Sequence, residues 1–391
     1  MPIKKEEIVK AYTTLIATVG ASLYGNLSKL PDCKTEFDNG SLEPIVQRMV
    51  SRSWGDPEEA MTYGSEINST VSLIRRFENL GEGTFNPINL YFFVSDTPIG
   101  EKIGTLLKSF FERDPELRFK NVKVIKIDKL SDTDEYAFGK EGLRNLVREF
   151  ARVARNHRFG LAVNATGGYK AQIAFALALG QAMKFPVFYR FERFDHIIKM
   201  PPLPVALDWE IYLTHHRLLD NLEDNAQFSE KKDLPQYGYK NYAEMPEELK
   251  TFLEREKIES EYYLGLSPMG QVFIESARER LTIETKLPTS EKSPSEKAKY
   301  IQDESHALNF VKKHNLYEKI SALPFVDKVV GFQYSQNFEL NGCKARMEGD
   351  EILLEYGNKG GTHRFKVYTT ARNPRERLAA LEHLKEAAKD W

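Results

Sequence analysis

A glycine pair, Gly167-Gly168, lies between a short apolar segment, residues 159–163, and a run of helix-forming residues, 171–183. A buried strand, a tight turn and a helix N-terminus in this order leave backbone N–H groups free to hold an anion. Lys170 adds a positive charge beside the turn. The segment therefore predicts a phosphate-bearing ligand at the carboxyl edge of an α/β sheet. The alternative is a turn that only lets the helix pack on the sheet.

Two earlier apolar segments end in residues of the same kind. Residues 13–19 lead into a loop of small residues, and residues 88–95 end in Ser-Asp-Thr before Pro98, which suits the first turn of a helix. Such strand ends are what a ligand crevice outside the carboxyl ends of parallel strands requires. The predicted ligand-binding residues are Gly20, Ala21, Ser22, Leu23, Ser95, Asp96, Thr97, Asn164, Thr166, Gly167, Gly168, Tyr169 and Lys170.

A second group of residues that could do chemistry lies near the C-terminus. In the expected strand 363–370, alternate residues include two cations and a tyrosine, which would share one face. Arg and Lys could stabilise a pentavalent phosphate, and Tyr or a perturbed Lys could transfer protons, so that the RNA 2′-hydroxyl cleaves its own backbone without a metal. An ordinary solvated face is the alternative. The predicted catalytic residues are Lys344, Arg346, Arg364, Lys366, Tyr368, Arg372 and Arg375.

Other nuclease patterns fit this region less well. Arg377 and His383 have the spacing of the Arg-x(4–6)-His motif of HEPN ribonucleases, but HEPN domains are helical and this region is predicted to be rich in strands. A metal-dependent restriction-type nuclease needs an Asp followed by Glu-x-Lys. Asp350 and Glu355 are present, but Gly357 stands at the lysine position. The metal-free interpretation therefore comes first.

Composition limits the remaining classes. The 391 residues, 41% of them hydrophobic, suffice for two or more domains, and the net charge of −2 gives no global attraction to nucleic acid. Two cysteines, Cys33 and Cys343, suit a reducing cytoplasm and argue against disulfides or a cysteine-based zinc site. No apolar run approaches the roughly 20 residues of a membrane span, and the N-terminus does not resemble a signal peptide. We expect a soluble cytoplasmic protein with no membrane partner, metal or cofactor.

The first predicted domain, residues 1–207, alternates segments of strand length with segments of helix length. This predicts βαβ units, a mainly parallel sheet and a Rossmann-like α/β fold. A hairpin of residues 187–191 and 196–200 would close the sheet before Pro201. The expected strands are 13–19, 88–95, 121–127, 159–164 and 185–191, and the expected helices are 65–80, 99–113 and 141–155.

The middle region, residues 208–290, is predicted to be helical, with helices over 208–222, 246–255 and 272–280. Its last helix follows a Ser-Pro cap, as in the second half of a winged-helix module. A helical connector between domains is the alternative. Polar residues 289–297 predict a linker.

The last domain, residues 298–391, is predicted to be a small α+β unit. Helices within residues 300–320 precede an antiparallel arrangement of strands, because turn residues separate the alternating segments. The expected strands are 326–332, 342–347, 351–356 and 363–370, followed by a helix over 375–389.

The loops 18–23, 95–97 and 164–170 resemble those of the CARF domain, the CRISPR-associated Rossmann-fold sensor, and the resemblance covers residues 1–207. It implies a homodimer that binds a cyclic oligoadenylate, cyclic tetra-adenylate first, across its two-fold axis, each protomer holding half of the ring. Binding would shift the conformational equilibrium of an effector domain by no more than the ligand's differential affinity for the two states.

The C-terminal region is similar to RelE-type toxins, the ribosome-dependent mRNA interferases, in its order of elements and in residues 342–347 and 364–375. It departs from them at Asp350 and Glu351, where such toxins carry an arginine. The chain as a whole resembles CARF–RelE fusions, the CRISPR-associated mRNA interferases. This implies a type III CRISPR ancillary effector that cuts mRNA in the ribosomal A site, with the ribosome, mRNA and the ribosomal stalk protein as partners. Phosphate stabilisation would fall to Arg364, Lys366 and Arg372, and positioning or proton transfer to Lys344, Arg346 and Tyr368.

The alternative function is a regulator gated by cyclic oligoadenylate. In that case the middle region would bind DNA and the C-terminal unit would bind protein. Both functions share the sensor and differ in what the remaining residues contact.

Overall fold

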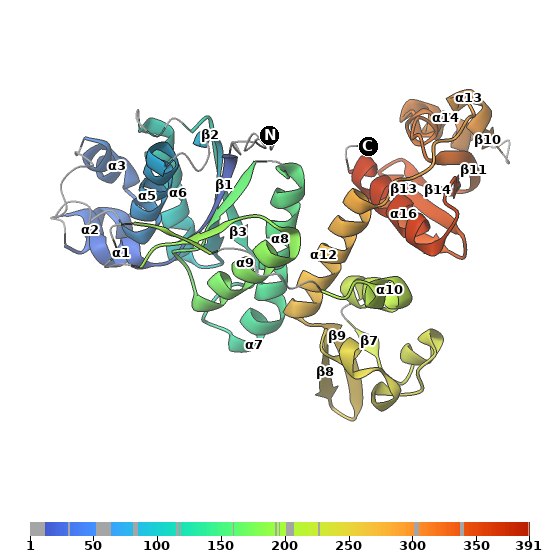
Figure 1. Ribbon diagram of the computed structural model, residues 1–391, viewed down its shortest axis with the longest axis horizontal. Helices are drawn as coiled ribbons and strands as arrows, with labels where there is room; N and C mark the ends of the chain where they lie inside the picture. Colours follow the sequence, from blue (N-terminus) through green and yellow to red (C-terminus); the bar gives the residue numbers. More distant parts are fainter. Residues whose placement is uncertain are drawn as a thin grey trace, which may run out of the picture. The chain divides into compact units, whose positions relative to one another are not determined.

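The computed structural model describes residues 12–29, 32–51, 64–80, 85–114, 117, 119–158, 160–191, 194, 196–200, 207–225, 227–300, 305–336, 340–389 and 391. Its contacts divide the chain into two units, which are described separately. Unit 1 comprises Met1–Leu207, Gln227–Leu234 and Tyr239–Glu275, and unit 2 comprises Asp208–Ala226, Pro235–Gly238 and Ser276–Trp391. Figure 1 shows the elements of both.

Unit 1 is built on a sheet with the strand order β3-β2-β1-β4-β5-β6 among the described residues. Neighbouring strands from β3 to β5 are parallel, and β6 pairs antiparallel to β5. This confirms the predicted α/β class, the mainly parallel sheet and the closing hairpin; Phe159 and Pro201 lie outside the described residues. The strands are β1 (Tyr12–Thr18), β2 (Phe85–Ser95), β3 (Asn121–Ile127), β4 (Leu161–Asn164), β5 (Val187–Tyr189) and β6 (Ile198–Met200).

Helices cover both faces of this sheet (Figure 1) because its strands are apolar on both sides. Leu90 and Phe92 of β2 pack into one core and Phe93 into the other, as the period of two requires. The first core is completed by α1 (Ser22–Leu27), α2 (Cys33–Asp38), α3 (Leu42–Val50), α5 (Gly64–Leu80) and α6 (Pro98–Arg113). The second is completed by the π-helical turn Phe138–Gly142, α8 (Leu143–Asn156) and α9 (Lys170–Met183).

A small antiparallel sheet, β7-β9-β8, also belongs to unit 1. Its elements are β7 (Phe228–Ser229), α11 (Glu247–Lys250), β8 (Leu253–Ile258) and β9 (Glu261–Leu266). The predicted helix over 246–255 is therefore wrong beyond Lys250. Leu253 pairs with Leu266 across the sheet, and Phe252 stacks on Phe273 with 4.1 Å between ring centroids. This tertiary pairing outweighs the helical propensity of the charged segment.

Unit 2 contains a sheet with the strand order β10-β11-β14-β13-β12 among the described residues. The strands β12, β13 and β14 form the predicted antiparallel meander, β11 pairs antiparallel with β14, and β10 is parallel to β11. The strands are β10 (Ala298–Tyr300), β11 (Val326–Ser335), β12 (Gly342–Glu348), β13 (Glu351–Asn358) and β14 (Gly361–Thr369). The helices are α10 (Glu210–Asp224), α13 (Pro294–Lys297), α14 (Ser305–Lys313), α15 (Leu316–Ser321) and α16 (Pro374–Ala388), and α12 (Pro268–Glu284) enters the unit at Ser276.

The predicted linker over 289–297 lies within unit 2 and is held there by hydrogen bonds and an ion pair. The N–H of Ser290 donates to the carbonyl of Pro324 at 2.8 Å, and the Lys292 ammonium lies 2.6 Å from Asp327 Oδ2. Lys297 is buried and donates to the carbonyls of Ser321 and Leu323, both at 3.2 Å. These contacts anchor the segment, so the linker prediction is wrong.

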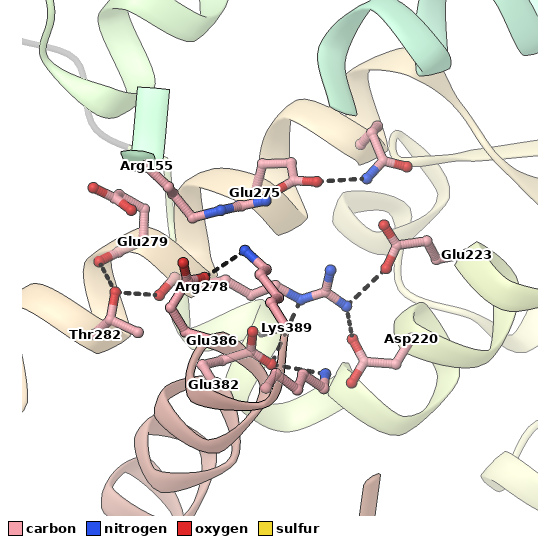
Figure 2. A network of polar contacts seen from close by, with 12 residues as sticks. Arg155, Asp220, Glu223, Glu275, Arg278, Glu279, Thr282, Glu382, Glu386 and Lys389 are labelled. Carbon is pink, nitrogen blue, oxygen red and sulfur yellow. Dashed lines mark hydrogen bonds and ion pairs between the residues drawn. The ribbon is translucent and has the colours of Figure 1, made fainter. Parts of the chain in front are cut away.

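A buried guanidinium joins three helices of unit 2 (Figure 2). Arg278 of α12 lies 2.6 Å from Asp220 and 2.7 Å from Glu223, both on α10, and 3.7 Å from Glu382 of α16. The buried Tyr212 hydroxyl donates to Asp220 at 3.0 Å. Burial acts to lower the pKa of Arg278, but the surrounding carboxylates, Glu223 first, hold it well above its ordinary value. The helices therefore pack around one positive charge.

Replacing Arg278 with Ala should lower the free energy of unfolding of unit 2 by about 3–5 kcal/mol, because the carboxylates would be left buried without a counter-charge. Urea unfolding followed by circular dichroism measures the change. Lys389→Ala, which removes an exposed pair with Glu386, is the matched control and should cost less than about 1 kcal/mol. Equal midpoints for the two variants would refute the assignment.

Candidate functional site

The strand order of unit 1 reverses between β1 and β4, and in such sheets ligands bind outside the carboxyl ends of the strands at this point. The loops that follow β1 and β4 are in direct contact there. A Cβ placed on Gly20 would lie 2.7 Å from the backbone nitrogen of Gly168, closer than real Cβ atoms come. The Thr18 hydroxyl also donates to the carbonyl of Gly167 at 2.5 Å. The structure therefore brings the first and third predicted loops together.

A carboxyl group from α5 occupies part of this junction. The N–H of Gly20 donates to Glu66 Oε1 at 2.8 Å, and the Ser22 hydroxyl lies 3.2 Å from Glu66 Oε2 and 2.8 Å from the Ser65 hydroxyl. The amide of Gly20, one of the predicted ligand-binding residues, is thus satisfied by the protein itself. Burial raises the pKa of Glu66 and outweighs the hydrogen bond from Gly20.

In the glycine turn after β4, one backbone amide is hydrogen-bonded to a side chain of the protein, whereas two others have no partner among the described residues. Gly168 adopts φ +97°, and the N–H of Tyr169 donates to Gln172 Oε1 at 2.7 Å. Within the described residues, the amides of Gly167 and Gly168 have no hydrogen-bond partner. Lys170, the first residue of the 14-residue helix α9, is exposed and makes no ion pair with any described residue. These groups remain able to hold an anion.

Asn164 and Thr166, both predicted to bind ligand, are used inside the fold. The Asn164 side chain is 1% exposed and donates to Ser69 at 2.7 Å and to Thr70 at 3.2 Å. The Thr166 hydroxyl donates to Asn164 Oδ1 at 2.6 Å and accepts the N–H of Arg190 at 3.0 Å. Because these polar atoms are already bonded, both residues brace β4 against α5 and β5 in this structure.

The loop after β2 is also engaged locally. Thr97 caps α6 by accepting the N–H of Gly100 at 3.0 Å, and its hydroxyl lies 2.9 Å from that of Ser95. Asp96 accepts the N–H of Lys129 at 3.1 Å and pairs with Lys126 at 3.2 Å; the bond from the Lys129 amide is the main cause that lowers its pKa.

The remaining predicted residues of unit 1 differ in exposure. Leu23 is buried in the core, whereas Ala21 is exposed. The Tyr169 ring packs edge-on against Phe138. Tyr169 thereby connects the turn after β4 to the π-helical turn Phe138–Gly142. Burial, ahead of the charge of Asp132, raises the pKa of the phenol.

Sequence reasoning missed Glu66, Ser65 and Gln172. Gln172 was visible only as part of the helix-forming run after the glycine pair, although a Gln three residues after a helix cap is a known capping pattern. No local sequence pattern links Glu66 to the glycine residues it contacts, because it lies 46 residues after Gly20 and 101 residues before Gly167.

The cations on the sheet of unit 2 share one face, as predicted, but they do not form a basic patch. Arg364 lies 2.6 Å and Arg346 lies 3.1 Å from Glu355, and Lys366 lies 3.2 Å from Glu351. The register explains this pairing, because Lys344, Glu355 and Arg364 lie opposite one another across β12, β13 and β14. Lys344 pairs with Asp224 at 3.1 Å. The face is therefore of mixed charge.

Proton transfer by this face is disfavoured by its carboxylates. The hydrogen bond to Glu351 raises the pKa of Lys366, and burial together with Glu351 raises that of Tyr368. Burial acts to raise the pKa of Glu355, but its bonds and charges with Arg364 and Arg346 hold it below its ordinary value. None of these groups has the shift that a general base near neutral pH requires.

The arginines near α16 have different environments. Arg375 lies over the Trp209 ring, 4.4 Å from its centroid, and donates to the Thr285 hydroxyl at 3.1 Å, so its side chain serves packing. Arg372 is exposed, and among the described residues its side chain makes no ion pair. The weaker HEPN pattern is not assembled, because Arg377 pairs with Asp350 whereas the ring of His383 lies against Phe325.

Asn164→Ala should destabilise unit 1 by about 1–3 kcal/mol, because the hydroxyls of Ser69 and Thr70 would lose a buried partner. Thermal unfolding measures the change. Asn121→Ala, which removes only an exposed hydrogen bond to Asn89 at 3.0 Å, is the control of the same residue type and should shift the midpoint by no more than a degree or so. An unchanged midpoint for Asn164→Ala would show that the residue does not brace β4.

Comparison with known proteins found a match for part of unit 1. Residues 61–203 match the model of a family described as CRISPR-associated protein (Cas_APE2256). The matched region contains β2 to β6, the glycine turn and Glu66, whereas unit 2 lies beyond it. No curated protein matches the chain. The family match supports a CRISPR-associated protein.

Proposed function

We propose that the chain is a type III CRISPR ancillary effector, an endoribonuclease that cyclic oligoadenylate activates and that cleaves mRNA on the ribosome without a metal. The proposal that the chain binds cyclic oligoadenylate rests on one observation. The exposed ammonium of Lys170 lies at the N-terminus of α9, next to the backbone amides of Gly167 and Gly168, which have no hydrogen-bond partner among the described residues. The family match supports the CRISPR context.

A cyclic oligoadenylate suits this arrangement for a physical reason. Its phosphodiesters are always ionised near neutral pH, so an ammonium group, free amides and the positive end of a 14-residue helix all favour it. A ring with two-fold symmetry also presents the same phosphates to two identical protomers. We therefore propose a homodimer, with cyclic tetra-adenylate as the first activator to test.

The proposed reaction in unit 2 is attack of an RNA 2′-oxygen on the adjacent phosphorus. The 5′-oxygen leaves with a proton, and a 2′,3′-cyclic phosphate remains. Arg372 is the predicted catalytic cation best able to meet a phosphate, since it is exposed and its guanidinium makes no ion pair among the described residues; only its backbone N–H is bound to a carboxylate, that of Glu376 at 2.7 Å. Arg364 and Lys366 would have to exchange Glu355 and Glu351 for the phosphate.

A second function has one observation in its favour. The carboxylates Glu351 and Glu355 offset the cations on the sheet of unit 2, which suits a protein partner better than an RNA backbone. A regulator gated by cyclic oligoadenylate is therefore the alternative. Purified protein mixed with the activator and either translating ribosomes or duplex DNA separates the two.

Lys170→Ala should weaken binding of labelled cyclic tetra-adenylate by about tenfold or more, because one ammonium–phosphate contact is lost. Equilibrium binding with both cyclic tetra- and hexa-adenylate measures the effect. Lys120→Ala is the control, since Lys120 is exposed and directly precedes β3, at the amino end of the sheet. If Lys170→Ala and Lys120→Ala bind alike, the ligand does not contact this helix end.

Arg372→Ala should slow activated cleavage of ribosome-bound mRNA by about a hundredfold, the usual effect of removing one charge that stabilises a transition state. Single-turnover cleavage at saturating activator gives the rate. Lys389→Ala, just beyond the other end of α16, should leave it unchanged. Cleavage by Arg372→Ala at the normal rate would exclude this arginine from the site.

A further inference from the structure

Glu66 touches both loops of the candidate site from beneath. Its side chain is fully buried, Oε1 accepts the N–H of Gly20, and Oε2 is within hydrogen-bond distance of the Ser22 hydroxyl. On the other side, a Cβ placed on Gly167 would overlap the Glu66 carboxyl group. One carboxyl therefore fills the junction where the amides and Lys170 are proposed to hold a phosphate.

Among the described residues, no cation forms an ion pair with Glu66 that would balance an ionised carboxylate. The helix α5 packs against α1, β1, β2 and β4. None of these elements contains an Asp, Glu, Lys, Arg or His, and their titratable side chains are Tyr12, Tyr24 and Tyr91. Tyr24 donates to Asp38 and Tyr91 bonds to His157, so neither serves Glu66.

An ionised carboxylate at the buried position of Glu66 is unfavourable in free energy. Removing an ionised carboxyl from water without a counter-charge is unfavourable by several kcal/mol, whereas the protonated acid is tolerated. The first turn of α5 and the Gly20 amide favour the charged form, but burial outweighs them and raises the pKa of the group. An incoming anion adds to the same bias, since it repels the carboxylate and not the acid.

We infer that Glu66 acts as a proton-dependent gate on anion binding at the glycine turn. In its acid form the side chain braces the two loops and leaves the ligand phosphate unopposed. In its ionised form it repels that phosphate. Binding would thus take up a proton, and affinity would fall as pH rises. The inference rests on the proposed sensor function and adds a positioning residue to it.

The test compares Glu66→Gln with wild type in the full-length protein. Gln keeps an acceptor for Gly20 and a polar contact with Ser22 but cannot ionise. Wild type should bind labelled cyclic tetra-adenylate at least about fivefold more weakly at about pH 8.5 than at about pH 5.5. Glu66→Gln should bind the ring with the same affinity at both pH values, and at the higher pH it should bind more tightly than wild type. Glu66→Ala should bind weakly throughout, because the brace is lost. Glu43→Gln, an exposed first-turn acid on α3, is the control and should follow wild type.

A pH profile of Glu66→Gln that matches wild type would overturn the inference. If wild type fails to bind the ring at any pH, the proposed function is wrong, and inorganic sulfate then replaces the ring as the probe. The charge of sulfate does not change in this range, so a difference between wild type and Glu66→Gln at about pH 8.5 supports the gate. Equal sulfate binding by the two proteins rejects it.

Discussion

Direct contact between the loops that follow β1 and β4 is the constraint on which unit 1 depends. Gly20 packs against the backbone of Gly168 so closely that no side chain fits between them. The parallel pairing of β1 with β4 fixes where these loops begin, and the hydroxyl of Thr18 holds the second loop by its carbonyl. Because the loops are locked to the sheet, the exposed Lys170 is presented at a defined position rather than on a free segment.

In unit 2 the corresponding constraint is the register of the antiparallel strands. Cross-strand neighbours of opposite charge attract, and here the register sets Glu355 between Lys344 and Arg364. The same pairing that stabilises the sheet lowers its capacity to attract a polyanion. On this face, the charge pairing that stabilises the sheet therefore opposes the attraction of any polyanion, whereas Arg372 lies beyond the last strand and is not part of that pairing.

Much of the framework could be predicted from local pattern, because strand length, helix length and turn residues are properties of neighbouring residues. The parallel sheet, its closing hairpin and the meander β12–β14 follow from such patterns. Contacts between distant residues could not be predicted. Nothing near Gly20 indicated that the carboxyl of Glu66 would take its amide, and nothing near Arg364 specified the partner Glu355. The helix expected over 246–255 failed for the same reason, since strand pairing of Leu253 with Leu266 overrode local propensity.

The junction between the units has a consequence for the modularity of this protein. The division falls between Glu275 and Ser276, within the continuous helix α12. Glu275 pairs with Arg155 on one side of that division, and Arg278 anchors α10 and α16 on the other. Severing the chain there would fray the helix and separate Arg278 from Asp220 and Glu223 of α10. An exchange of the residues that follow α12 would therefore have to keep α12 whole, together with its contacts to α10.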